Sequence, residues 1–194
     1  LHQFLEIFCD IEEELRNVSK TFLNDYAVNS RLRDVGFLTK QQAHDLGAVG
    51  PFMRASGIAL DNRKLGYAAY ADLEFEPITS SVGDCYARCD VRIQEIFQSI
   101  DLIRQAINKI PVGDIAVPVK GFPSGEHFMR VEQPRGEAIY YVKANGTKFL
   151  DRVRVRTPTF ANLPGMLETL KGCQLADVPI LILTIDPCIS CTER

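Results

Sequence analysis

The chain has 194 residues, of which 46% are apolar and 24% are charged. This composition is ordinary for a globular protein and excludes a collagen-like fibre, a coiled coil and a disordered tail. The net charge of −3 does not indicate a basic face, so we expect no nucleic-acid partner. The longest apolar run, residues 178–185, is too short to cross a bilayer as a helix. The chain begins at Leu1, with no methionine and no basic-then-apolar leader, so we expect no signal peptide and expect Leu1 to be an internal residue of a longer protein.

The first half of the chain is predicted to consist of helices joined by loops. Residues 1–29 carry apolar side chains every three or four positions, which predicts an amphipathic helix. Thr39 is suited to cap a short helix that runs to Gly47. Three glycines and a proline in residues 47–57 predict an ordered loop whose backbone closely approaches another segment. Residues 84–110 form the longest helical candidate, with a broad apolar face.

The second half of the chain is predicted to contain a small antiparallel sheet followed by helices. Asn145 and Gly146 form a strong hairpin signal, because this pair favours the left-handed backbone of a tight turn. The apolar run at 178–185 fits a buried strand and a buried helix equally well. In order, the segments are a Gly- and Pro-rich stretch at 118–134, strands at 137–142 and 148–156, a helix at 162–170 and the apolar run.

These elements give an α+β fold class that is mainly α, with a bundle of long helices and a small antiparallel sheet. Residues 1–112 are expected to be mainly helical, and residues 113–160 to hold loops and the hairpin. Residues 161–194 are expected to hold a helix, the buried run and a carboxyl-terminal pair of cysteines.

The carboxyl-terminal C-x-x-C motif is the most informative feature. Asp186 before Pro187 predicts a helix that opens at Asp186, which places Cys188 and Cys191 one turn apart on one face. A helix amino terminus favours thiolates, and two thiolates at this spacing can hold a soft metal. Three alternatives are open: half of a structural zinc site completed by Cys85 and Cys89, a dithiol redox motif, or two incidental buried thiols.

A second motif surrounds Arg135. Pro134 and Gly136 restrict the backbone on either side, so that the guanidinium can be held in one place and can stabilise negative charge. Taken alone, the motif favours a turn that enters a hairpin and carries a solvated arginine. Thr159, in the segment Thr157-Pro158-Thr159, could donate a hydrogen bond to an anion, although by itself this segment is also a turn.

Several stretches together, and in this order, resemble the large subunit of NiFe hydrogenases. They are residues 47–57, Gly83-Asp84-Cys85-Tyr86 with its helix, Pro134-Arg135-Gly136-Glu137 with its hairpin, and the stretch from Asp186 to Cys191. The chain is most similar to the carboxyl-terminal portion of the energy-converting, membrane-associated (Ech-like) group, which is related to the quinone-site subunit of respiratory complex I. The last motif belongs to the hydrogenase branch, because the complex I subunit lacks the metal cysteines.

The resemblance implies a binuclear nickel–iron centre with Cys188 as a terminal nickel thiolate and Cys191 as a bridging thiolate. It implies that Arg135 lies over the open face of the metals and that Asp186 is its neighbouring carboxylate. Pro134 would line the same pocket, and Thr159 is a weaker match to a hydroxyl that donates to an iron-bound cyanide. We therefore take Arg135, Asp186 and Cys188 as the candidate catalytic residues.

Two departures from the family pattern are informative. Arg-x-Cys-Gly-x-Cys, which supplies the other two metal cysteines in the family, does not occur, and the proton-relay glutamate near it is also missing. This chain can thus supply only half of the cysteine ligands, so we expect it to be inactive and metal-free by itself. Arg194 stands where many hydrogenases have a histidine. In the energy-converting group, an arginine is common at this position.

The resemblance implies that the parent protein is a hydrogenase that interconverts hydrogen with protons and electrons. Its partners would be an iron–sulfur small subunit, membrane subunits and the remaining amino-terminal part of the large subunit. Through these partners, the protein would lie peripherally on the cytoplasmic side of the cell membrane. A dimer of this chain is also possible, driven by apolar surface left exposed. The alternatives are a complex I-type scaffold without metal, with which the terms quinone binding and NAD binding are associated, and the structural zinc module.

Overall fold

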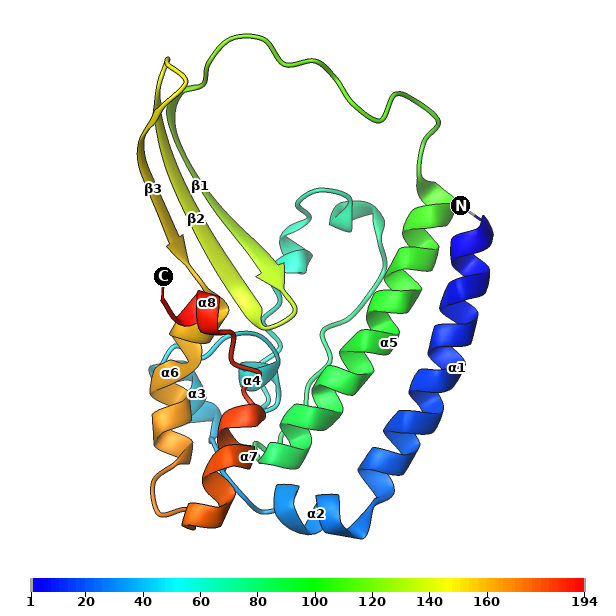
Figure 1. The fold of residues 1–194 in the computed structure, drawn as a ribbon, viewed down its shortest axis with the longest axis vertical. Coiled ribbons are helices and arrows are strands. Elements are labelled where there is room, and N and C mark those ends of the chain that lie inside the picture. Colours follow the sequence, from blue (N-terminus) through cyan, green and yellow to red (C-terminus); the bar gives the residue numbers. More distant parts are fainter. Residues whose placement is uncertain (1, 194) are drawn as a thin grey trace.

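The computed structural model describes residues 2–193, so Leu1 and Arg194 and the expectations that fall on them lie outside the described residues. The fold is mixed α+β and mostly helical, with a three-stranded antiparallel sheet (Figure 1). The helices are α1 (His2–Asn24), α2 (Tyr26–Leu32), α3 (Lys40–Asp45), α4 (Gly50–Arg54), α5 (Cys85–Lys109), α6 (Pro158–Thr169), α7 (Val178–Leu183) and α8 (Ile189–Thr192). The strands are β1 (Ser124–Gln133), β2 (Gly136–Asn145) and β3 (Leu150–Arg156), and short 3-10 turns occupy Asn62–Leu65, Tyr70–Asp72 and Leu175–Asp177.

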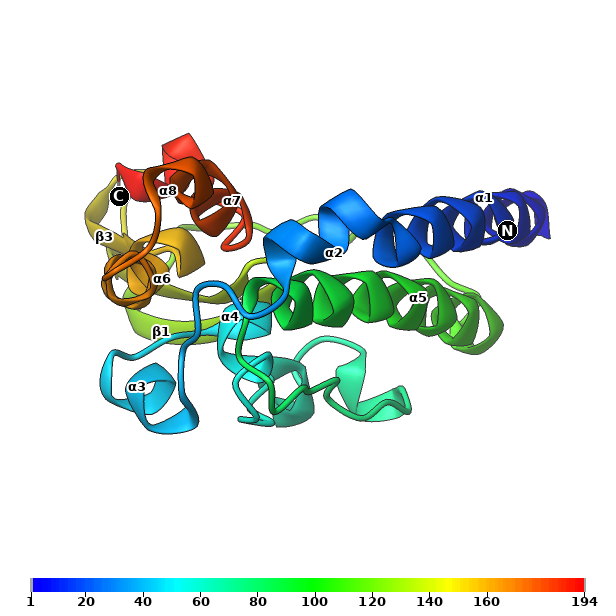
Figure 2. The same ribbon diagram turned by 90° about the horizontal axis from the view of Figure 1, so that it is seen from below.

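The long helices α1 and α5 lie side by side and run in opposite directions (Figures 1 and 2). The helix predicted at 1–29 is divided, because the Asp25 side chain accepts a hydrogen bond from the Val28 amide at 2.9 Å and starts α2. The helix predicted at 84–110 is confirmed, with Asp84 as its amino-terminal cap and Ile110 as its carboxyl-terminal cap. Local capping chemistry explains both outcomes.

The glycine-rich segment after α3 contains a short helix, so the prediction of a loop throughout residues 47–57 was wrong. Pro51 lies in the first turn of α4, where its missing amide hydrogen is not needed. The expected close approach is observed, however. A Cβ atom on Gly50 would lie 2.3 Å from the Gly136 Cα atom, so the backbones of α4 and β2 touch.

The strands form an antiparallel meander in the order β1-β2-β3. The predicted hairpin between β2 and β3 is confirmed, although its connection spans residues 146–149 rather than two residues. Strand β1 was not predicted. It pairs with β2 until Gln133 faces Gly136, which leaves Pro134 and Arg135 as a two-residue turn.

The carboxyl-terminal third is helical. Thr157 caps α6, which therefore begins earlier than the predicted residue 162, and the apolar run at 178–185 contains helix α7 rather than a strand. The prediction that a helix opens at Asp186 was wrong. Asp186 has a left-handed backbone (φ +57°), and Cys188 is the residue that caps α8.

The buried core joins these helices to the segment that precedes Cys188. Leu38, Phe52 and Ile185 belong to one cluster, and Leu32, Cys85 and Leu181 form another. Leu181 therefore anchors α7 in the second cluster, and Ile185, the residue before Asp186, is anchored in the first. Within the part of the chain that the structure describes, no helix combines the length and apolarity needed to cross a bilayer.

Candidate functional site

Two arginines of α5 fix the chain where α7 ends. Arg88 Nε donates a hydrogen bond to Thr184 Oγ1 at 3.1 Å, and Arg92 Nη1 donates to the Thr184 carbonyl oxygen at 2.6 Å. Thr184 is buried, and so is Ile185 after it. These contacts place Asp186 at a defined point beside α5.

The turn between β1 and β2 brings Arg135 onto Asp186. Arg135 Nε donates to the Asp186 carbonyl oxygen at 2.8 Å and lies 3.1 Å from Asp186 Oδ2. Both side chains are partly exposed, at 36% and 43%. Since Pro134 restricts one side of Arg135 and Gly136 contacts Gly50 on the other, the guanidinium is held by backbone as well as by the carboxylate.

The start of α6 holds the two cysteines. Thr159 Oγ1 accepts a hydrogen bond from the Cys188 amide at 3.3 Å, and Thr157 Oγ1 donates to the Cys191 carbonyl oxygen. Both threonines are buried. The structure therefore places Thr159 against the C-x-x-C segment, with its oxygen occupied as an acceptor.

Cys188 caps α8 and Cys191 lies in its single turn; both cysteines are half-buried. Cys188 Sγ is 3.2 Å from Ser190 Oγ. This contact, the interaction with Cys191 and the charge of Arg135 lower the pKa of Cys188 to about 7. The pKa of Cys191 is raised by its hydrogen bond with Cys188. The pair is thus able to present one thiolate at neutral pH.

The two thiols supply fewer ligands than a protein-bound metal ion ordinarily has. Among the described residues, no three His, Cys, Asp or Glu side chains gather as a ligand group, so this chain offers two thiolates only. Cys85 and Cys89 pack with Leu32 and Leu181 instead, as core residues do. Two soft sulfurs on one turn fit half of a nickel–iron site, and they do not by themselves complete a tetrahedral zinc site.

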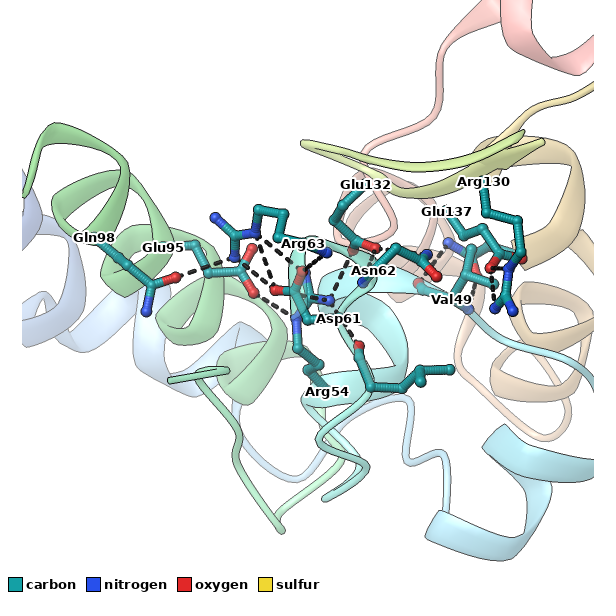
Figure 3. A network of polar contacts seen from close by, with 12 residues as sticks. Val49, Arg54, Asp61, Asn62, Arg63, Glu95, Gln98, Arg130, Glu132 and Glu137 are labelled. Atoms are coloured by element: carbon teal, nitrogen blue, oxygen red, sulfur yellow. Dashed lines mark hydrogen bonds and ion pairs between the residues drawn. The ribbon is translucent and has the colours of Figure 1, made fainter. Parts of the chain in front are cut away.

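Behind Pro134 and Asp186 lies a cavity of about 290 Å³ whose wall includes Arg92, Glu95 and Glu132. A buried charge network forms part of this wall (Figure 3). Its centre is Arg54, which is 1% exposed; Arg54 Nε lies 2.7 Å from Glu95 Oε1 and its Nη1 lies 2.8 Å from Glu132 Oε1.

Asp61 and Arg63 complete the network through an ion pair of 2.6 Å between Asp61 Oδ2 and Arg63 Nη2 (Figure 3). Burial alone would raise the pKa of Asp61, but hydrogen bonds from Arg63 and the charge of Arg54 hold this pKa below its ordinary value. Burial raises the pKa of Glu95 despite its bond to Arg54. The network links the 3-10 turn Asn62–Leu65, α4, α5 and the end of β1.

The structure therefore brings together all the site residues expected from sequence, namely Pro134, Arg135, Thr159, Asp186, Cys188 and Cys191. Sequence reasoning missed the supporting arginines. The apolar pattern of the helix predicted at 84–110 does not mark Arg88 or Arg92 as buried, yet Arg88 is 1% exposed. Their spacing of four residues was the available signal, because it places them on one helix face.

The sequence was compared with known families. A profile described as respiratory-chain NADH dehydrogenase, 49 Kd subunit, matches residues 1–122 and 118–194. The chain belongs to the complex I 49 kDa/NiFe hydrogenase large-subunit family.

Relatives from both branches of this family align with nearly the whole chain. It is 40% identical to a carbon monoxide-induced hydrogenase of Rhodospirillum rubrum over 95% of this chain and 52% of the relative. It is 39% identical to a membrane-bound hydrogenase subunit alpha of Pyrococcus furiosus over 94% of this chain and 47% of the relative. The chain is 35% identical to a subunit of the NADH-quinone oxidoreductase of Solibacter usitatus over 93% of this chain and 53% of the relative. The chain thus spans about half the length of these relatives.

Proposed function

We propose that the chain is the carboxyl-terminal part of the catalytic subunit of an energy-converting NiFe hydrogenase. The observation that carries the proposal is the C-x-x-C pair on α8, positioned beside the Arg135–Asp186 ion pair by α5, α6 and the β1–β2 turn. The similarity to two proteins described as hydrogenases supports the same branch.

In this proposal, Cys188 and Cys191 would hold the nickel–iron centre through their thiolates. When bound, the centre supplies the redox chemistry that interconverts hydrogen with protons and electrons. The other cysteine ligands come from outside this chain, so the chain alone is inactive and metal-free.

The surrounding residues orient the site and tune its charge. Asp186 fixes the plane of the Arg135 guanidinium, which faces developing negative charge as a fixed cation. Thr159 holds the Cys188 backbone and Pro134 shapes the adjacent cavity wall. As a thiolate ligand of the centre, Cys188 would be suited to take up or release a proton at its sulfur.

The antiparallel α1–α5 pair would belong to a larger bundle of long helices, completed by the amino-terminal part of the subunit. We propose that residues 1–194 form one carboxyl-terminal portion of that domain. The assembled protein would pass electrons to an iron–sulfur small subunit and lie at the cytoplasmic side of the membrane through membrane subunits. Relatives named as subunits of a membrane-bound hydrogenase and of an F420H2 dehydrogenase support a multisubunit assembly.

The second candidate is a complex I-type subunit without metal. The matching profile describes a complex I subunit, and the NADH-quinone oxidoreductase subunit of Solibacter usitatus is 35% identical to the chain. In this case Cys188 has no functional role, and the same fold serves as a scaffold near a quinone site.

The test is hydrogen turnover by the complex purified from the complete gene, with a viologen dye as electron acceptor. Cys188→Ser is expected to lower turnover by at least about 100-fold, and Arg135→Lys by about 10- to 100-fold because Asp186 loses its fixed partner. Cys173→Ser, which changes a cysteine packed near Leu32, is the control and should retain turnover. An intact complex without hydrogen turnover, or with turnover that survives Cys188→Ser, would support the scaffold instead.

A further inference from the structure

Only one of the three guanidinium nitrogens of Arg92 donates hydrogen bonds within the described part of the chain. Its Nη1 atom donates to the carbonyl oxygens of Arg88, at 3.1 Å, and Thr184, at 2.6 Å. Its Nε and Nη2 atoms are buried and have no hydrogen-bond partner among the described residues. Buried donors are normally satisfied, so two on one edge of one side chain require an explanation.

Arg88, one turn earlier on the same helix, shows what full use looks like. Its Nε atom donates to Thr184 Oγ1 at 3.1 Å, and its Nη1 atom donates to the carbonyl oxygens of Gly36 and Gly83. Its Nη2 atom lies 3.0 Å from Cys85 Sγ. The fold therefore provides a partner for each guanidinium nitrogen of Arg88. The unpaired Nε and Nη2 atoms distinguish Arg92 from this neighbouring buried arginine of α5.

Arg92 is one of the residues that line the cavity of about 290 Å³. Three carboxylates share this cavity wall, but each already accepts from another arginine: Glu95 and Glu132 from Arg54, and Asp186 from Arg135. In the described part of the chain, none of these three accepts a hydrogen bond from the Nε or Nη2 atom of Arg92. Because both donor atoms are covered from solvent, an acceptor in the cavity reaches them by displacing side chains of the wall, and it then meets no competing partner.

We infer that Arg92 is the receptor of a carboxylate that enters this cavity from outside the chain. The Nε and Nη2 atoms form a planar pair of donors, which matches the two oxygens of a carboxylate. The ligand is either an Asp or Glu side chain of a further segment of the protein or a free small carboxylate. The side-chain source rests on the proposed function, in which this chain is part of a longer subunit; the need of Arg92 for an acceptor does not.

Formate is the probe, because it is the smallest carboxylate and needs no metal or turnover. Thermal unfolding of this chain is followed while sodium formate replaces sodium chloride at constant ionic strength. We expect a saturable rise in the unfolding midpoint of about 3–6 °C at ten times the dissociation constant. Arg92→Lys keeps the charge but lacks the paired donors, so it should abolish the rise. Arg104→Lys, which changes a partly exposed arginine on the same helix that does not line the cavity, should retain it.

A second readout covers the case in which Arg92→Lys does not fold. The Nε–H resonance of Arg92 in the wild-type chain should shift with formate and not with chloride. Absence of a formate-specific effect in the wild type, or an equal effect in a folded Arg92→Lys variant, overturns the inference. If the rise occurs in this chain but disappears in the product of the complete gene, the occupant is a side chain; if it persists there, the ligand is a free carboxylate. Neither result depends on hydrogen turnover, so the proposed function is tested separately.

Discussion

Asp186 has two roles that a substitution can separate. Its carboxylate pairs with Arg135, and its left-handed backbone (φ +57°) turns the chain from α7 toward Cys188. Asparagine tolerates this backbone conformation better than most residues, whereas alanine loses about 1–2 kcal/mol in it.

We therefore expect Asp186→Ala to destabilise the chain by about 1 kcal/mol more than Asp186→Asn. Both variants remove the charge, so the difference reports the backbone conformation together with the hydrogen bond that an asparagine oxygen can still accept from Arg135. Urea unfolding of the two variants measures it. Equal stabilities would mean that the left-handed conformation of Asp186 is not a constraint in the folded chain.

Gly136 is required by the contact that positions Arg135. A Cβ atom at Gly136 would lie 2.8 Å from the Gly50 backbone nitrogen, and its φ of +126° also disfavours other residues. Gly136→Ala should cost about 2–4 kcal/mol in unfolding free energy, because overpacking and backbone strain add. Gly146→Ala is the matched control, since Gly146 has φ +79° and a Cβ atom added there would meet no atom within 4 Å; about 1 kcal/mol is expected there. Similar losses in the two variants would contradict the close approach.

At the residue scale, the sequence predicted local features better than long-range ones. Thr39 caps its helix as expected, because a cap depends on residues within four positions. The Arg135–Asp186 contact joins residues 51 positions apart, and only the resemblance to a known family implied it. The burial of Arg88 could not be predicted from α5 alone, since Gly36, Gly83 and Thr184 supply its partners.

At the scale of elements, the charge network around Arg54 connects α4, α5 and β1. Removing Arg54 would leave the buried carboxylates of Glu95 and Glu132 without their cation. We expect Arg54→Met to lower the unfolding free energy by about 3–5 kcal/mol. Arg31→Met, which removes an exposed ion pair with Asp177, should change it by less than about 1 kcal/mol. Denaturant unfolding compares the two, and a small loss in Arg54→Met would show that the network is not a determinant of stability.

The elements themselves were predicted unevenly. Helix α5 was predicted almost to the residue, because its apolar periodicity is long and its ends are marked. Strand β1 was missed since five of its ten positions are exposed and its glycine and charged residues hide any alternation; pairing with β2 defines it. The short helix α4 was missed because its glycine and proline argue locally against a helix, whereas packing of Phe52 in the core stabilises it.

At the scale of the whole molecule, the chain exposes an apolar surface on α1 that is suited to an interface. It spans about half the length of its relatives, and large apolar side chains such as Phe4, Ile7 and Ile11 are exposed on α1. Large apolar patches favour association. The predicted dimer of this chain is checked by sedimentation equilibrium, in which a monomer at micromolar concentration would contradict it.

The most direct test of the central claim, that Cys188 and Cys191 are half of a nickel–iron ligand set, is nickel content. The complex produced from the complete gene should contain about one nickel per large subunit, bound through sulfur in its X-ray absorption spectrum. Cys191→Ser should remove most of this nickel while the complex stays assembled, and this chain alone should retain none. Unchanged nickel in Cys191→Ser, or stoichiometric nickel and iron in the isolated chain, would contradict the account.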